Sequence, residues 1–88
     1  MSRFYVHNLT NQSLHIHQSE NDSWMELPDK GFAVFECSNG NMLSGHCENG
    51  SFFIKVSPGI IKTYPFGKFE IKIKGYHDGE SYAEITER

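Results

Sequence analysis

The chain has 88 residues, of which 22% are charged, and a formal net charge of −3. A chain of this length encloses one hydrophobic core, so we predict a single domain over residues 1–88. It has neither a cluster of Lys and Arg that would bind nucleic acid nor a run of about 20 apolar residues that would cross a membrane. Its first residues also lack the apolar segment of a secretory signal, so we expect a soluble, cytoplasmic protein.

Apolar and polar side chains alternate near the N-terminus and predict strands over residues 3–9 and 13–18. A third, shorter strand is predicted over residues 24–27. Residues 28–31, which read Pro-Asp-Lys-Gly, are typical of a turn. The side chains expected to face the core in the first two strands are Phe4, Val6, Leu14 and Ile16.

Two Asn-Gly pairs, at residues 39–40 and 49–50, predict a three-strand meander in the middle of the chain. A two-residue turn at the second pair places Cys47 opposite Phe52. The core-facing side chains of the meander are then Phe32, Val34, Leu43, Cys47, Phe52, Ile54 and Val56. Glu36 also falls on this face, where a charged side chain is a misfit.

Residues 57–59 predict a further turn, followed by a strand over residues 60–64 in which either Ile60 or Ile61 faces the core. Residues 68–88 then predict a hairpin with one polar face. A three-residue loop at residues 77–79 places Ile71 opposite Ile85, Ile73 opposite Ala83 and Lys72 opposite Glu84, whereas a two-residue turn would mix apolar and charged side chains on one face. In that loop Gly79 needs a positive φ.

These seven or eight short strands, with turns roughly every 8–12 residues, predict an all-β fold. We expect a small antiparallel β-sandwich, or a partly open barrel, whose strands are joined by tight hairpins.

Three histidines are candidate metal ligands. His15 and His17 alternate on one strand, so their side chains share a face about 6.5–7 Å apart. Two imidazoles at that spacing can reach one Zn²⁺ if other ligands complete the tetrahedron, and His7 on an adjoining strand is the candidate third ligand. The alternative is that all three are polar residues on a solvent-facing surface.

Cys37 and Cys47 are expected to be thiols, as is usual in the cytoplasm. The predicted register points them to opposite faces of the meander, which disfavours a disulfide between them and a metal site shared with His46. Four Asn-x-Ser/Thr triplets, beginning at residues 8, 11, 21 and 49, are interpreted as turn-forming residues.

Aromatic side chains supply the candidate binding residues. Trp24, Tyr64 and Phe66 are expected at loop edges, where they could stack on a sugar or a partner side chain, or else cap the ends of the sandwich. The second face of the meander carries Phe35, Met42 and Phe53 beside Cys37. These three side chains either form an exposed interface patch or pack on neighbouring loops.

No phosphate-binding loop, pair of catalytic carboxylates or Ser-His-Asp set can be placed, so we expect no enzyme and no cofactor. The aromatic surplus favours a non-catalytic module that binds a protein partner. The alternatives are a carbohydrate or other small-ligand binder that uses Trp24, Tyr64 and Phe66, and a histidine-based metal-binding protein.

We also expect a homo-oligomer. The strand over residues 13–18 carries no charge apart from its histidines, and as an edge strand it could pair with a second copy. If His15 and His17 lie at that contact, the assembly should weaken below about pH 6.

Overall fold

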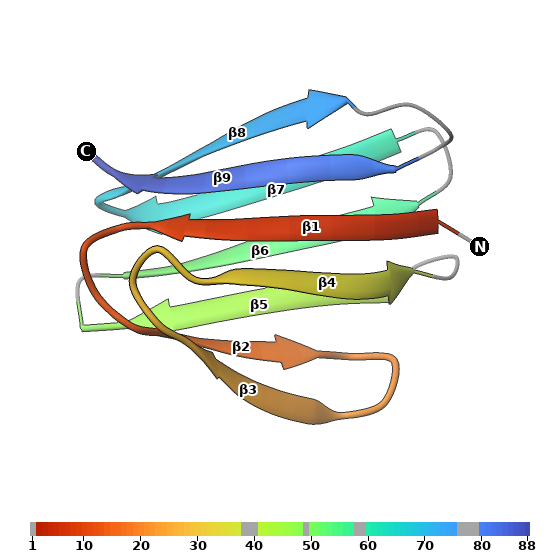
Figure 1. The fold of residues 1–88 in the computed structure, drawn as a ribbon, viewed down its shortest axis with the longest axis horizontal. Helices are drawn as coiled ribbons and strands as arrows, with labels where there is room; N and C mark the ends of the chain where they lie inside the picture. The colour runs from red at the N-terminus through yellow and green to blue at the C-terminus, as the bar shows by residue number, and fades with distance from the viewer. Residues whose placement is uncertain (1, 38–40, 49, 58–59, 76–79) are drawn as a thin grey trace.

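The computed structural model describes residues 2–37, 41–48, 50–57, 60–75 and 80–88, which form two packed β-sheets (Figure 1). The four-stranded sheet contains, in spatial order, β4 (Phe32–Cys37), β1 (Ser2–Leu9), β9 (Ser81–Glu87) and β8 (Phe69–Gly75). The five-stranded sheet contains β3 (Ser23–Leu27), β2 (Leu14–Gln18), β5 (Asn41–Cys47), β6 (Gly50–Ser57) and β7 (Ile60–Gly67). The all-β sandwich is confirmed, with nine described strands instead of seven or eight. No helix that could span a membrane occurs within the described ranges.

The four-stranded sheet is not purely antiparallel. β1 and β9 run parallel, with Val6 opposite Ala83, while the other neighbouring strands in the described parts of the chain are antiparallel. A parallel pair cannot be joined by a tight hairpin. Here it brings together the first and the last strand of the chain, which corrects the expectation of a wholly antiparallel sandwich.

The core lies between the sheets and is built from alternate residues of the strands, because successive side chains of a strand point to opposite faces. The inward-facing residues predicted for the first two strands are confirmed. Phe52 and Phe69 meet edge to face, with ring centroids 5.6 Å apart. The core consists of Phe4, Val6, Leu14, Ile16, Leu27, Ala33, Phe35, Leu43, Phe52, Ile54, Val56, Phe69, Ala83 and Ile85.

A buried polar cluster around Asn8 holds the loops at one end of the sandwich. Asn8 Nδ2 donates to the carbonyl oxygens of Gln12, Leu27 and Pro28 at 2.7, 2.9 and 3.1 Å. Asn8 Oδ1 accepts hydrogen bonds from the main-chain N–H and the hydroxyl of Thr10. Asn8 and Thr10 are both 0% exposed, so the triplet they form organises two neighbouring loops from inside the fold.

The turn predicted at residues 28–31 is confirmed. The Gly31 N–H donates to the Pro28 carbonyl at 2.8 Å, and Lys30 adopts a φ of 64°. The Lys30 N–H donates to the Asn8 carbonyl, which joins this turn to the end of β1.

The C-terminal hairpin has the register that a three-residue loop predicts. Its confirmed pairs are Ile71 with Ile85, Ile73 with Ala83 and Lys72 with Glu84. The loop itself, with Gly79, lies outside the described residues. The ion pair on the outer face is diagonal, with Lys74 Nζ 2.6 Å from Glu84 Oε1, and the hydrogen bond and charge of this ammonium lower the pKa of the Glu84 carboxyl.

The hairpin predicted at residues 39–40 is wrong, because β4 and β5 belong to different sheets. β4 pairs with β1, where Val34 lies opposite Tyr5, and β5 pairs with β2. Residues 38–40 themselves lie outside the described ranges. An Asn-Gly pair is a local signal, whereas the choice of sheet depends on strands that are distant in the sequence.

Because β4 belongs to the other sheet, its buried and exposed faces are the reverse of those predicted. Phe35 is 1% exposed and packs in the core, so it is corrected from a candidate binding residue to a core residue. Phe32 and Val34, which the meander placed inside, are 51% and 52% exposed. Glu36 points away from the core and is exposed, which removes the misfit of the predicted inner face.

β5 and β6 pair as the second Asn-Gly turn predicted, but their register differs by two residues from the prediction, and residue 49 lies outside the described residues. Gly45 lies opposite Phe52, and Cys47 lies opposite Gly50. A shift by two keeps every side chain on its predicted face, because the side-chain period of a strand is two. Cys47 has a free thiol and is partly buried against the core, while the side chain of Cys37 lies outside the described part.

The structure also decides whether residues 13–18 form an edge strand and which isoleucine of β7 faces the core. β2 lies between β3 and β5, so residues 13–18 do not form an edge strand. Ile61, one of the two alternatives in β7, packs against the core.

Candidate binding face

One row of side chains crosses all five strands on the outer face of the five-stranded sheet. Residues directly opposite one another on neighbouring strands point to the same face. With about 4.8 Å between strands, the row extends over roughly 19 Å. From β3 to β7 it consists of Trp24, His17, Ser44, Phe53 and Tyr64.

A second row runs beside the first and consists of Glu26, His15, His46, Ser51 and Phe66. Met42 lies next to these rows on β5. We define the aromatic face as Trp24, His17, His46, Met42, Phe53, Tyr64 and Phe66. Its most exposed members are Trp24 at 62%, Phe66 at 52% and Tyr64 at 46%.

The indole of Trp24 is positioned by its neighbours although it is exposed. Its ring centroid lies 4.7 Å from that of His17 and 6.0 Å from that of His46. His17 is itself held, with Nε2 2.7 Å from Asp22 Oδ1. Because these contacts restrict the rings before any partner arrives, binding here loses less side-chain entropy than at a mobile surface.

A second aromatic group lies on β6 and β7. The rings of Phe53 and Phe66 meet edge to face at 6.0 Å, and Tyr64 lies opposite Phe53. The small side chains of Ser44 and Ser51 separate this group from Trp24. The face therefore presents two aromatic groups with small side chains between them.

Charged side chains lie around the aromatic face and not within its first row. Lys55 of β6 lies opposite Lys62 of β7 and forms one border. Glu26 lies on the edge strand β3, at the opposite border.

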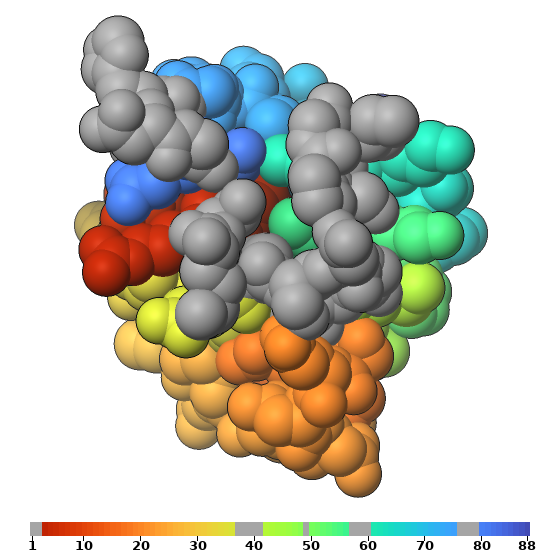
Figure 2. Space-filling view, turned by 90° about the vertical axis from the view of Figure 1, so that its right-hand side faces the viewer, coloured from red at the N-terminus to blue at the C-terminus, as the bar shows by residue number. Residues whose placement is uncertain are grey.

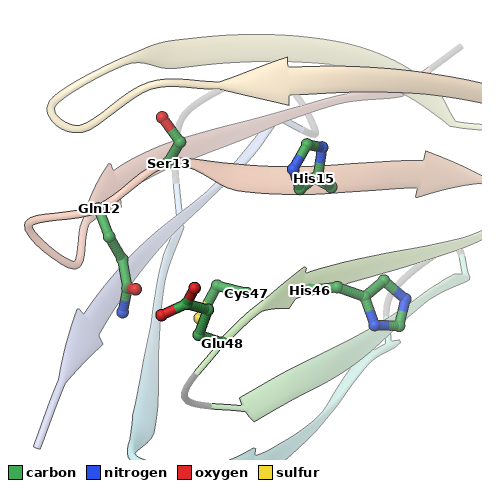
Figure 3. Close-up of a pocket in the computed structure, with 6 residues that line it drawn as sticks. All are labelled: Gln12, Ser13, His15, His46, Cys47 and Glu48. Atoms are coloured by element: carbon green, nitrogen blue, oxygen red, sulfur yellow. The ribbon is translucent and has the colours of Figure 1, made fainter.

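A shallow depression of about 520 Å³ adjoins the aromatic face near the end of β5. It is lined by Gln12, Ser13, His15, His46, Cys47 and Glu48, and Figure 3 shows the ring of His46 pointing away from Cys47 and Glu48. Gln12 Nε2 is buried there and has no hydrogen-bond partner among the described atoms. The polar side chains of this depression do not converge on one point.

His7 is too far from His15 and His17 to be the third ligand of the predicted metal site. His7 lies on β1 in the four-stranded sheet, where its Nδ1 is 2.7 Å from the Tyr82 hydroxyl. The core separates it from His15 and His17, whose strand does not adjoin β1. Within the described residues, no three His, Cys, Asp or Glu side chains are placed to hold a metal ion.

The structure brings five of the six candidate binding residues together on one face, and only Phe35 is elsewhere. Trp24 and Phe66 lie one residue from the end of their strands, near the loops as expected, and Tyr64 lies further inside β7. All three point to the outer face of the sheet, so they do not cap the ends of the sandwich. The place of Ser44 and His46 between the rings does not follow from the sequence, because it depends on the pairing of β2 with β5.

A second aromatic cluster lies on the outer face of the four-stranded sheet. Phe32 is 5.5 Å from Tyr5 and 5.7 Å from Tyr82, measured between ring centroids. Tyr82 is 9% exposed, so the accessible surface of this cluster belongs mainly to Phe32.

No protein-family model matches the chain, and no curated protein or solved structure matches it either.

Proposed function

We propose that this protein is a non-catalytic module that binds a partner protein on the aromatic face. The observation that carries the proposal is the gathering of Trp24, Met42, Phe53, Tyr64 and Phe66 on one face of the five-stranded sheet. A cytoplasmic location is part of the same proposal, and the free thiol of Cys47 is compatible with it.

The composition of the face supports a protein partner. Interfaces are enriched in Trp, Tyr, Phe and Met, are depleted of charge at their centre and have a polar rim. The aromatic face has this arrangement, since Lys55, Lys62 and Glu26 lie at its borders. The partner surface should therefore be apolar at its centre and carry Asp or Glu where it meets the two lysines. A second copy of this chain is one such protein, which keeps a homo-oligomer within the proposal.

Panning a random peptide library on the wild-type protein tests the proposal. The selected peptides should bind Trp24→Ala at least about 30-fold more weakly, since an aromatic side chain that anchors an interface contributes about 2 kcal/mol or more. Phe66→Ala should also weaken binding. Phe32→Ala is the matched control, because Phe32 is as exposed as Phe66 but lies on the other sheet. Peptides that lose affinity for Phe32→Ala and bind Trp24→Ala normally would refute the proposal.

A neutral oligosaccharide is the second candidate ligand. The specific observation in its favour is that the partly exposed Ser51 and His46 lie between exposed rings, so stacking and hydrogen bonding are available together. Calorimetry with a panel of neutral oligosaccharides distinguishes the two. If sugar binding disappears in Trp24→Ala and no peptides can be selected, the ligand of the aromatic face is a glycan and not a protein.

A further inference from the structure

The two sheets differ in strand number, and the hairpin of β2 and β3 extends past β4 (Figure 1). Figure 2 shows the same hairpin protruding at the bottom of the molecule. Met25 lies opposite Ile16 and therefore points to the core side of the five-stranded sheet, yet it is 37% exposed, whereas Ile16 is 1% exposed. The core side of β3 is thus only partly covered by the other sheet.

β4 borders this uncovered area with an open main-chain edge. Among the described strands, β4 pairs with β1 alone. The Asn8 N–H donates to the Gly31 carbonyl at 2.9 Å, and hydrogen-bonded pairs alternate along an antiparallel ladder. Continued along the register, this alternation directs the N–H and C=O groups of Phe32, Val34 and Glu36 away from β1.

The side chains of β4 do little to guard this edge. Natural sheets protect their edges with charges or proline. β8 carries Lys72 and Lys74, and β7 contains Pro65. β4 has a single charged residue, Glu36, while its other two outward-facing side chains are apolar and half exposed.

We infer that β4 accepts an extended segment of a partner protein as a fifth strand of its sheet. Main-chain hydrogen bonds to residues 32, 34 and 36 would supply affinity, as in other cases of strand addition. Side chains on one face of the added strand would cover Met25, and those on the other face would pack beside Val34. The segment should therefore carry apolar residues on both faces where it passes these two side chains.

Charge specifies the segment further. Residues 10–37 contain five acidic residues and one lysine, a net charge of −4, while the whole chain has −3. Glu36 lies at the end of β4 that follows Val34, and Glu20 and Asp22 lie in the loop between β2 and β3. The partner segment should therefore have Lys or Arg next to its apolar residues.

A whole second copy does not fit this edge. Antiparallel pairing of two β4 strands would place both β2–β3 hairpins on the same side of the joined sheet, where each would occupy the space of the other domain. A single extended segment avoids this overlap, which is why the inference names a segment.

The probe is a synthetic peptide of alternating valine and isoleucine flanked by lysines. Its control is the same peptide with a proline in place of the central residue. Peptide binding should slow amide hydrogen exchange at Phe32, Val34 and Glu36 and shift the Met25 methyl resonance. Trp24→Ala, which alters the aromatic face, should bind the probe as the wild type does. The result is thus independent of the proposed function.

Val34→Pro should weaken the affinity for the probe at least about tenfold, because proline removes the outward-pointing N–H of residue 34 without removing a hydrogen bond to β1. Glu36→Lys should also weaken binding of the probe, and it replaces the proline variant in the test if that variant does not fold. Val34→Thr is the matched control and should bind the probe as the wild type does. The inference is overturned if the probe does not bind at its solubility limit or binds the proline variant equally well. Protection of the three amides that rises with protein concentration alone would assign the edge to a second copy and would also overturn it.

Discussion

Replacing Asn8 with alanine is expected to lower the free energy of unfolding by about 3–4 kcal/mol, because each buried polar group left without a partner costs about 1–3 kcal/mol. The Asn8 side chain is fully buried and bonds the carbonyls of Leu27 and Pro28 as well as the N–H of Thr10. Its loss leaves groups from two segments unsatisfied. Asn8→Asp should restore little stability, because a carboxylate would place oxygen against those carbonyls.

Denaturant unfolding measures this effect, and Asn21→Ala provides the control. Asn21 is exposed, and its side chain accepts one hydrogen bond, from the Ser23 hydroxyl. Its replacement should change stability by no more than about 0.5 kcal/mol. If Asn8→Ala were as mild as this control, the buried cluster would not hold the loops as described.

Gly45→Ala is expected to destabilise the fold by about 2–3 kcal/mol, the usual range for overpacking a well-packed core. Gly45 faces the core directly opposite Phe52, and an added methyl group would overlap the Phe52 ring. The ring cannot move aside freely, since Phe52 is 0% exposed and packs edge to face on Phe69.

Thermal or denaturant melts of a double-mutant cycle test this explanation. Phe52→Leu removes the ring, so Gly45→Ala should cost clearly less in that background, with a coupling of about 1 kcal/mol or more. Gly75→Ala is the matched control. No atom of the described residues lies within 4 Å of its added methyl group, so the change should be nearly neutral. Additive effects of the two core changes would contradict the account.

Local patterns predicted the parts of the fold that local chemistry controls. The alternation in β1 and β2 gave the correct inward faces. In the C-terminal hairpin it gave the correct register, because a two-residue turn would have placed Ile73 opposite Glu84 and Lys72 opposite Ile85. The two-residue shift at residues 49–50 escaped prediction, since both registers place the same side chains in the core.

Long-range pairing could not be predicted in the same way. The Asn-Gly pair at residues 39–40 favoured a hairpin, but β4 pairs with β1 and so buries Phe35 while exposing Phe32 and Val34. A strand with apolar residues on both faces fits either orientation, so its own sequence does not decide which face is buried.

In the candidate site, too, the local sequence predicted some features and the long-range pairing of strands determined the others. The sequence identified Trp24, Tyr64 and Phe66 as unusual but not that they share a surface. Their common face follows from four strand pairings, one of which joins His17 to Ser44 across strands that are far apart in the chain.

The most direct measurement of the central claim is an amide chemical-shift map of the wild-type protein titrated with a peptide selected by panning. The account predicts that the largest changes fall on β3, β2, β5, β6 and β7, centred on the row from Trp24 to Tyr64. The indole N–H of Trp24 should shift with the same affinity. Changes centred instead on Tyr5, Phe32 and Tyr82 would place the binding site on the other sheet and contradict the account.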